Sequence, residues 1–207
     1  MNEEIIMLKT GATAEIVEKK SRFIATIRPV STESEAISFI DEMKKKYYDA
    51  RHNCWAYCLG TDGAITKSSD DGEPSGTAGR PMLEVITGSG IKNIAVVVTR
   101  YFGGVLLGTG GLVRAYQSAT KEALSLCETV QQKYGVKFNV KTDYNSIGKL
   151  QYLFSNANVA TLDTLYEADV LFTAICPEEN YSKLCKDITE ATSAKAIIEE
   201  LERLYYT

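Results

Sequence analysis

The stretch that decides the fold of this chain reads Thr99-Arg-Tyr-Phe-Gly-Gly-Val-Leu-Leu-Gly-Thr-Gly-Gly-Leu-Val-Arg-Ala-Tyr116, and it follows the apolar run at residues 94–98. That run is β-branched, has no polar alternation and is too short for a buried helix, so it predicts a central strand covered on both faces. After the glycines, apolar residues recur at helical spacing from Leu112 to Ala123. The sequence therefore predicts a strand, a glycine-rich loop and a helix in succession, the helix ending near Val130.

The glycine-rich loop predicts a place where backbone comes close to another group. Its glycines are Gly103, Gly104, Gly108, Gly110 and Gly111. A helix that begins here points unpaired N–H groups and the positive end of its macrodipole at one spot, and Arg100 and Arg114 add full charges. We therefore expect a phosphate or another anion to bind there. Tight turning and close helix packing explain the same glycines equally well. The loop is neither a Walker A motif nor a dinucleotide-binding fingerprint.

An earlier loop combines glycines and hydroxyl residues with the carboxylates of Asp70, Asp71 and Glu73. Pro81 suits the first turn of a helix, so the sequence predicts a helix over residues 81–88. The three carboxylates could hold a hard cation or pair with Arg80 and Arg100. Because no calcium-loop pattern follows, we favour pairing and expect no metal. Arg80 is also a candidate for binding an anion.

Together these two loops resemble the signature of the IMPACT family in its bacterial, YigZ-like form, and the resemblance covers essentially the whole chain. It implies an α+β protein of two domains. The first would have the fold of domain 2 of ribosomal protein uS5 and of elongation factor G domain IV, and the second a ferredoxin-like fold similar to elongation factor G domain V. Eukaryotic members regulate translation under amino-acid starvation through an additional RWD domain, for which this chain has no room.

The pattern along the chain gives the same division. We expect an Impact N-terminal domain over residues 1–130, a linker at 131–134 and the ferredoxin-like domain over 135–207. In the first domain we expect two strands before a helix capped by Ser31 or Thr32, and a hairpin turn at Thr61-Asp-Gly63. The apolar stripe of that helix would be Ile37, Ile40, Met43 and Tyr47. The second domain reads as βαββαβ, with Tyr144, Ile147, Leu150 and Phe154 pointing inward from its first helix.

Candidate groups for catalysis are few. Cys54 and Cys58 lie in a strand-like run, which separates their sulfurs by roughly 13 Å, too far for one zinc ion or one disulfide. His52 is the only histidine, and an i, i+2 pair with Cys54 on a strand is roughly 6.6 Å apart, beyond hydrogen-bond contact. The five cysteines are odd in number, which favours reduced thiols. We expect no catalytic residue and no cofactor.

Charge and composition narrow the possible partners. The chain of 207 residues has 23 Lys and Arg against 27 Asp and Glu, a net charge of −4. Neither half is a basic nucleic-acid binder overall, so RNA contact would need a local patch. The sequence shows no export signal and no membrane span, so we expect a cytoplasmic location and no membrane partner.

Two hypotheses of function remain open. The first is a non-enzymatic, translation-associated regulator that binds RNA or the ribosome, or a protein of the translation machinery, through the glycine-rich loops and Arg80, Arg100 and Arg114. The second is a protein or enzyme whose same loops bind a small phosphorylated ligand. A pocket beside Asp70 or Asp71 favours the second hypothesis, and an open basic surface favours the first.

Overall fold

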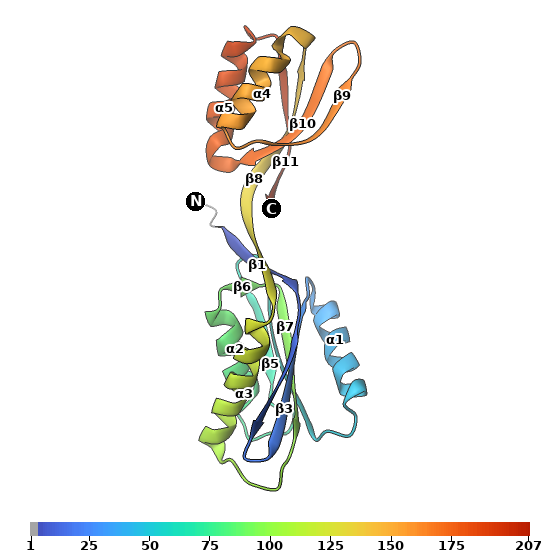
Figure 1. Ribbon diagram of the computed structural model, residues 1–207, viewed down its shortest axis with the longest axis vertical. Coiled ribbons are helices and arrows are strands. Elements are labelled where there is room, and N and C mark those ends of the chain that lie inside the picture. Colours follow the sequence, from blue (N-terminus) through green and yellow to red (C-terminus); the bar gives the residue numbers. More distant parts are fainter. Residues whose placement is uncertain (1–3) are drawn as a thin grey trace. The chain divides into compact units, whose positions relative to one another are not determined.

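The computed structural model describes residues 4–207, and the first residues of the acidic amino terminus, where no export signal is expected, lie outside the described residues. The chain forms two compact units, divided between Gln131 and Gln132. Figure 1 shows helices and strands in both, which confirms the α+β class. Within residues 4–207 no helix is long and apolar enough to cross a membrane.

The first unit is built on a five-stranded antiparallel sheet in the order β2-β3-β7-β4-β5. Its strands and helices are β1 (Ile5–Thr10), β2 (Thr13–Glu18), β3 (Ser21–Pro29), α1 (Glu33–Lys46), β4 (His52–Leu59), β5 (Ile65–Ser69), α2 (Gly79–Gly88), β6 (Ile91–Lys92), β7 (Ile94–Tyr101) and α3 (Thr109–Ser125). Helices α2 and α3 lie on one side of the sheet and α1 on the other (Figure 1).

Strand β7 is the centre of this sheet, as its apolar run predicts. Ile94, Val96 and Val98 pack into the core under α2 and α3. Ala95 and Val97 point the other way, into the core under α1. Each fully buried valine or isoleucine contributes roughly 1.5–3 kcal/mol, so burial on both faces fixes the register of the whole sheet.

Helix α1 begins as predicted, because the Thr32 hydroxyl accepts a hydrogen bond from the Glu35 N–H at 3.2 Å. The predicted apolar stripe is wrong at Ile37, which is 53% exposed. The buried face is made instead by Ala36, Phe39, Ile40 and Met43. The small Ala36 side chain lets the helix lie close to the sheet, and this turns the helix away from the face that Ile37 occupies.

Three predicted boundaries differ from the observed ones. Helix α2 begins two residues early, at Gly79, because a side chain caps its first N–H groups. Helix α3 ends at Ser125 instead of near Val130, since the residues after it join β8 (Glu128–Thr142). The expected linker at 131–134 lies within β8, and Lys133 and Tyr134 pair with Tyr206 and Tyr205 of β11. The strands β1 and β6, which pair in parallel, were not expected from the sequence.

The second unit confirms the predicted βαββαβ order. After β8 come η1 (Tyr144–Ser146), α4 (Ile147–Asn156), β9 (Ala160–Tyr166), β10 (Val170–Pro177), α5 (Glu178–Ala191) and β11 (Ile197–Tyr206). The sheet is antiparallel in the order β9-β10-β8-β11. Both helices cover the same face, and their Leu150, Phe154, Leu184 and Ile188 reach the core. Tyr144 does not point inward: it is 51% exposed, and its hydroxyl donates to the Glu167 carbonyl.

Candidate functional site

The antiparallel register brings both glycine-rich loops to one end of the first unit. His52 at the start of β4 pairs with Arg100 near the end of β7, and Arg22 at the start of β3 pairs with Tyr101. The last residue of β5, Ser69, pairs with Trp55 at the same end. The turn from β2 to β3, the loop at 70–78 and the loop at 102–108 therefore lie at one edge of the sheet, together with the amino termini of α2 and α3.

The acidic loop at 70–78 is held by its own carboxylates. Asp70 accepts hydrogen bonds from the backbone N–H groups of Gly76, Ala78 and Gly79, at 2.8, 2.9 and 2.8 Å. Burial raises the pKa of the Asp70 carboxyl, but these N–H groups outweigh that effect and bring the pKa below its usual value. Asp70 thus occupies the amino terminus of α2, and this cap explains why the helix begins at Gly79.

Asp71 and Glu73 also have partners within the protein. Asp71 accepts from Lys44 at 2.9 Å and from the Asn53 N–H at 2.7 Å. Glu73 is buried, and its Oε1 accepts from Arg100 Nη1 at 2.7 Å and from the Tyr116 hydroxyl at 2.8 Å. The predicted pairing of these carboxylates with arginine is confirmed for Glu73 and Arg100.

Arg100 therefore lies inside the protein, although the sequence places it among the candidate anion-binding residues. Only 8% of its side chain is exposed, and its Cζ lies 5.5 Å from the ring centroids of both Phe23 and Phe102. Arg80 lies elsewhere, on the outer face of α2, where it is 80% exposed and forms an ion pair with Glu84 at 3.2 Å. Its predicted pairing with the acidic loop is not observed.

The second loop packs against the turn from β2 to β3. A Cβ on Gly103 would lie 2.0 Å from the backbone of Lys20, and the Gly103 N–H donates to the Ser21 hydroxyl at 3.2 Å. Only glycine allows this approach. Gly108 has φ +73°, a left-handed conformation that precedes the first residue of α3, and Gly104 is left-handed as well. Gly110 and Gly111 lie in the first turn of α3 itself.

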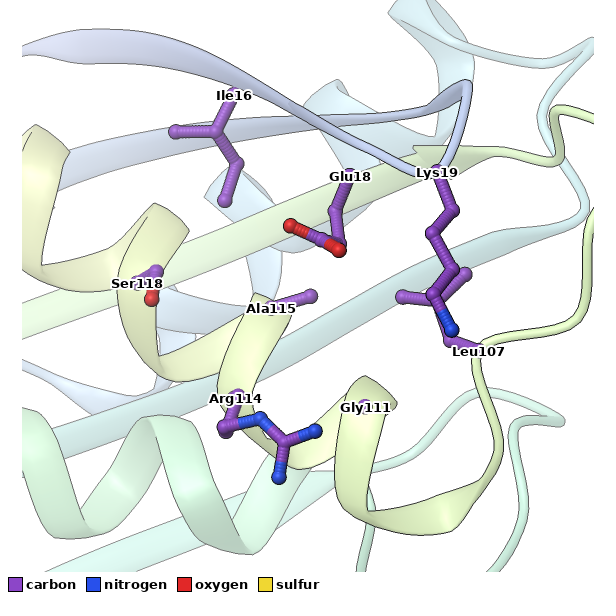
Figure 2. Close-up of a pocket in the computed structure, with 8 residues that line it drawn as sticks. All are labelled: Ile16, Glu18, Lys19, Leu107, Gly111, Arg114, Ala115 and Ser118. Carbon is purple, nitrogen blue, oxygen red and sulfur yellow. The ribbon is translucent and has the colours of Figure 1, made fainter.

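This packing places unpaired cations beside the amino terminus of α3. Lys19, Lys20 and Arg114 are exposed, and none forms an ion pair or side-chain hydrogen bond with any residue between 4 and 207. Figure 2 shows Glu18 and Lys19 reaching toward α3, with Arg114 beside Gly111. These residues line a hollow of about 250 Å³. In contrast to α2, no carboxylate of the described chain caps this helix.

Further cations lie in the last turn of α1 and on the loop between α1 and β4. The Tyr101 hydroxyl donates to Asp49 at 2.7 Å, which brings this loop to the end of β7. That hydrogen bond raises the pKa of Tyr101 to about 12. Lys45 and Arg51 are exposed nearby and have no ion-pair partner in the described part of the chain. Tyr48 beside them is 84% exposed.

We call this surface the basic end, and it comprises Lys19, Lys20, Lys45, Arg51 and Arg114. It also exposes apolar side chains, since Phe102 is 49% and Leu106 82% exposed. Sequence reasoning found only Arg114 of the five cations. Residues 19 and 20 carry none of the Asn-Gly or Asp-Gly dipeptides that mark a two-residue hairpin turn, so no local signal identifies these two lysines.

Cys54 and His52, the candidate groups for catalysis in the sequence, are both engaged with backbone carbonyls. Cys54 is fully buried, its thiol donates to the Asp70 carbonyl at 2.9 Å, and burial raises its pKa. His52 Nδ1 lies 2.9 Å from the Asp71 carbonyl oxygen. All five cysteines are free. Within residues 4–207 no group of three or more His, Cys, Asp and Glu side chains is placed to hold a metal ion.

Comparison with known proteins identifies the class to which this architecture belongs. The Impact N-terminal domain matches residues 19–124, which contain both loops, and a domain of unknown function (DUF1949) matches residues 140–195. The chain belongs to the IMPACT family.

The bacterial relatives are similar over most of this chain. IMPACT family member YvyE of Bacillus subtilis is 40% identical over 96% of this chain and 91% of its own length. IMPACT family member YigZ of Escherichia coli is 36% identical, over 81% of this chain and 84% of its own. The rat protein named IMPACT is 34% identical over 51% of this chain and 34% of its own length. A crystal structure of a hypothetical protein is 31% identical, with a TM-score of 0.63 over 97% of this chain and 98% of that chain.

Proposed function

We propose that this protein is a non-enzymatic, translation-associated regulatory protein that binds RNA, free or within the ribosome, through the basic end of its first unit. One observation carries the proposal. The chain has a net charge of −4, yet five cations without an ion-pair partner in the described part of the chain lie at this one end, where the carboxylates of Asp70, Asp71 and Glu73 are engaged within the protein. A phosphate backbone would meet positive charge there, while these three carboxylates already have partners within the protein.

The composition of this surface also suits RNA. Exposed Phe102 and Tyr48 lie among the lysines and arginines, and interleaved aromatic and basic residues bind unpaired nucleotides by stacking and charge together. The uncapped amino terminus of α3 adds N–H donors for a phosphate oxygen. Family membership supports a role in translation, because the resemblance to elongation factor domains implies one.

A small phosphorylated ligand is the second candidate. The hollow between Lys19, Gly111 and Arg114 has a volume of about 250 Å³ and is lined by both cations. Glu18 lines the same hollow and would repel a phosphate, whereas the exposed cations Lys45 and Arg51 lie outside it. The spread of charge beyond the hollow favours an extended polyanion.

The turn from β2 to β3 gives a sharp test. Lys19 and Lys20 have φ values of 44° and 69°, a pair of left-handed residues for which Asn-Gly is the preferred sequence. The double substitution Lys19→Asn with Lys20→Gly removes two charges and should leave the fold at least as stable. We expect it to weaken co-sedimentation with ribosomes and RNA, and to reduce the slope of log affinity against log salt by about 1.4.

A matched control removes the same charge elsewhere. Lys183 and Lys186 are exposed on α5 of the second unit, and Lys183→Gln with Lys186→Gln should leave binding unchanged. Equal binding by the wild type and the turn variant at every salt concentration would refute the basic end as the RNA surface. Failure of the wild type to bind any RNA, together with thermal stabilisation by a nucleotide or sugar phosphate, would favour the second candidate.

A further inference from the structure

We infer that Phe102 is a stacking platform for an unpaired base, so that the basic end selects single-stranded over duplex RNA. This inference rests on the proposed function and names the form of RNA that the site accepts. It starts from a contrast within one side chain. Phe102 is 49% exposed, whereas most phenylalanines of this chain are buried.

The inner side of Phe102 is fixed by a buried guanidinium. Arg100 Cζ lies 5.5 Å from the ring centroid of Phe102 and the same distance from that of Phe23, so the guanidinium contacts both aromatic rings. Glu73 holds Arg100 Nη1 at 2.7 Å, and both side chains are more than nine-tenths buried. Phe23 is fully buried and packs edge-on against Tyr116 at 5.2 Å. The side chain that contacts Phe102, Arg100, is therefore fixed by buried neighbours.

An aromatic ring fixed from below and open above suits a flat partner. Ordering of the ring before binding lowers the entropy that a ligand must overcome. A cation beneath the ring has already engaged one face of the π system, which leaves the outer face for stacking. A nucleobase offers the flat surface that this face can cover, and stacking of this kind tolerates any base.

The surroundings of Phe102 fit the rest of a nucleotide. Gly103 and Gly104 follow it, and a Cβ on Gly104 would meet no atom within 4 Å, so no side chain screens the loop. Lys20 lies directly against Gly103, and its exposed amine can reach a phosphate attached to a stacked nucleoside. The base and the phosphate of one residue thus each have a partner.

The form of the RNA follows from the shape of the contact. In a duplex both faces of each base are covered by its neighbours, so a ring on the protein surface can stack only on an unpaired base or a strand end. Insertion into a lipid surface would use the same exposed Phe102 and Leu106. It would not need the buried Arg100–Glu73 pair that orders the ring, and this pair favours RNA.

The experiment measures fluorescence anisotropy with a labelled single-stranded uridine oligomer of about 12 nucleotides and with a labelled RNA duplex of the same length. We expect the wild type to prefer the single strand. Phe102→Ala should lower single-strand affinity about 5- to 100-fold without changing the salt slope, because it removes no charge. Phe102→Trp should restore binding. Leu162→Ala, on β9 of the second unit and 54% exposed, is the control and should change affinity less than twofold.

The outcomes separate this inference from the proposed function. Equal affinity of the wild type for both RNAs, or unchanged single-strand binding by Phe102→Ala, would overturn the stacking platform while the charge variants still test the basic end. Absence of binding to either RNA, with binding to anionic vesicles that Phe102→Ala abolishes, would overturn both and assign the loop to a membrane surface.

Discussion

The loops at 70–78 and 102–108 are both rich in glycine, but they differ in whether the protein supplies carboxylate partners for the helix that follows. Both precede a helix on the same side of the sheet, and both lie at the same end of the first unit. In the first loop, Asp70 caps α2 and Glu73 binds the buried Arg100. In the second loop no carboxylate caps α3, and Arg114 has no ion-pair partner among the described residues.

This contrast shows that a glycine-rich loop before a helix is not by itself an anion site. Unpaired N–H groups at a helix terminus must find an acceptor, and a protein can supply one from its own chain. The first loop does so and becomes part of the core. In the second loop, the positive end of α3 and its neighbouring cations have no carboxylate partner among residues 4–207.

Breaking the buried pair under the first loop should have the largest effect. Arg100→Met leaves the buried Glu73 carboxyl group without its cationic partner, and loss of one partner of such a pair costs about 3–5 kcal/mol. Chemical denaturation should therefore show a large loss of unfolding free energy. Arg80→Met, on an exposed side chain, should change it by less than about 0.5 kcal/mol.

A double variant distinguishes structure from binding. Arg100→Met with Glu73→Gln should recover part of the loss, because no unpaired charge stays buried. If Arg100→Met keeps full stability and loses RNA binding, then Arg100 contacts the ligand and the two loops do not differ as described.

Removing the cap of α2 should have an intermediate effect that depends on pH. Asp70→Ala should lower the unfolding free energy by about 0.5–2 kcal/mol at neutral pH, the usual contribution of a helix cap. Because the pKa of Asp70 is lower in the folded protein, its contribution is complete above the unfolded value of about 3.9 and disappears as the pH falls through the folded value.

Urea titrations of the wild type and the variant at several pH values measure this difference. The gap between the two proteins should be constant near neutrality and should shrink below about pH 4. Asp41→Ala, on the exposed face of α1, serves as the control and should show almost no gap. A gap that widens in acid would mean that Asp70 is not a charged cap.

The smallest effect should come from Gly110. Its φ is not left-handed, it lies in the first turn of α3, and the nearest atom to an added Cβ is Arg114 Nη1 at 3.6 Å. Gly110→Ala should therefore raise the unfolding free energy by about 0.5–1 kcal/mol. Gly108→Ala, at φ +73°, should lower it by about 1–2 kcal/mol. Thermal denaturation of both variants would show whether these glycines differ in this way.

The sequence predicts features that local chemistry determines. The β-branched run before Thr99, the Thr32 cap and the βαββαβ order all depend on neighbouring residues, and all are observed. The misplaced features depend on contacts between distant residues. Arg100 is buried because Glu73 reaches it across 27 positions, and the two-residue strand β6 exists only because β1 pairs with it.

The candidate site shows the same limit. Arg114 can be found from its place in a glycine-rich motif. Lys19 and Lys20 lie beside Arg114 only because Gly103 contacts the β2–β3 turn. Gly103 and its hydrogen-bond partner Ser21 are 82 residues apart along the chain. No local pattern contains that information, since Lys19-Lys20 is not a preferred turn dipeptide.

Trp55 has a practical consequence for every stability measurement on this protein. It is the only tryptophan, it lies on β4 of the first unit, and its ring stacks on Tyr57 with centroids 5.6 Å apart. Its emission therefore reports unfolding of that unit alone, whereas circular dichroism follows both. If the fluorescence and circular dichroism curves superimpose, the two units unfold in one cooperative transition, and strand β8, which continues across the boundary between them, would explain the coupling. Separate curves would assign each free energy to its own unit.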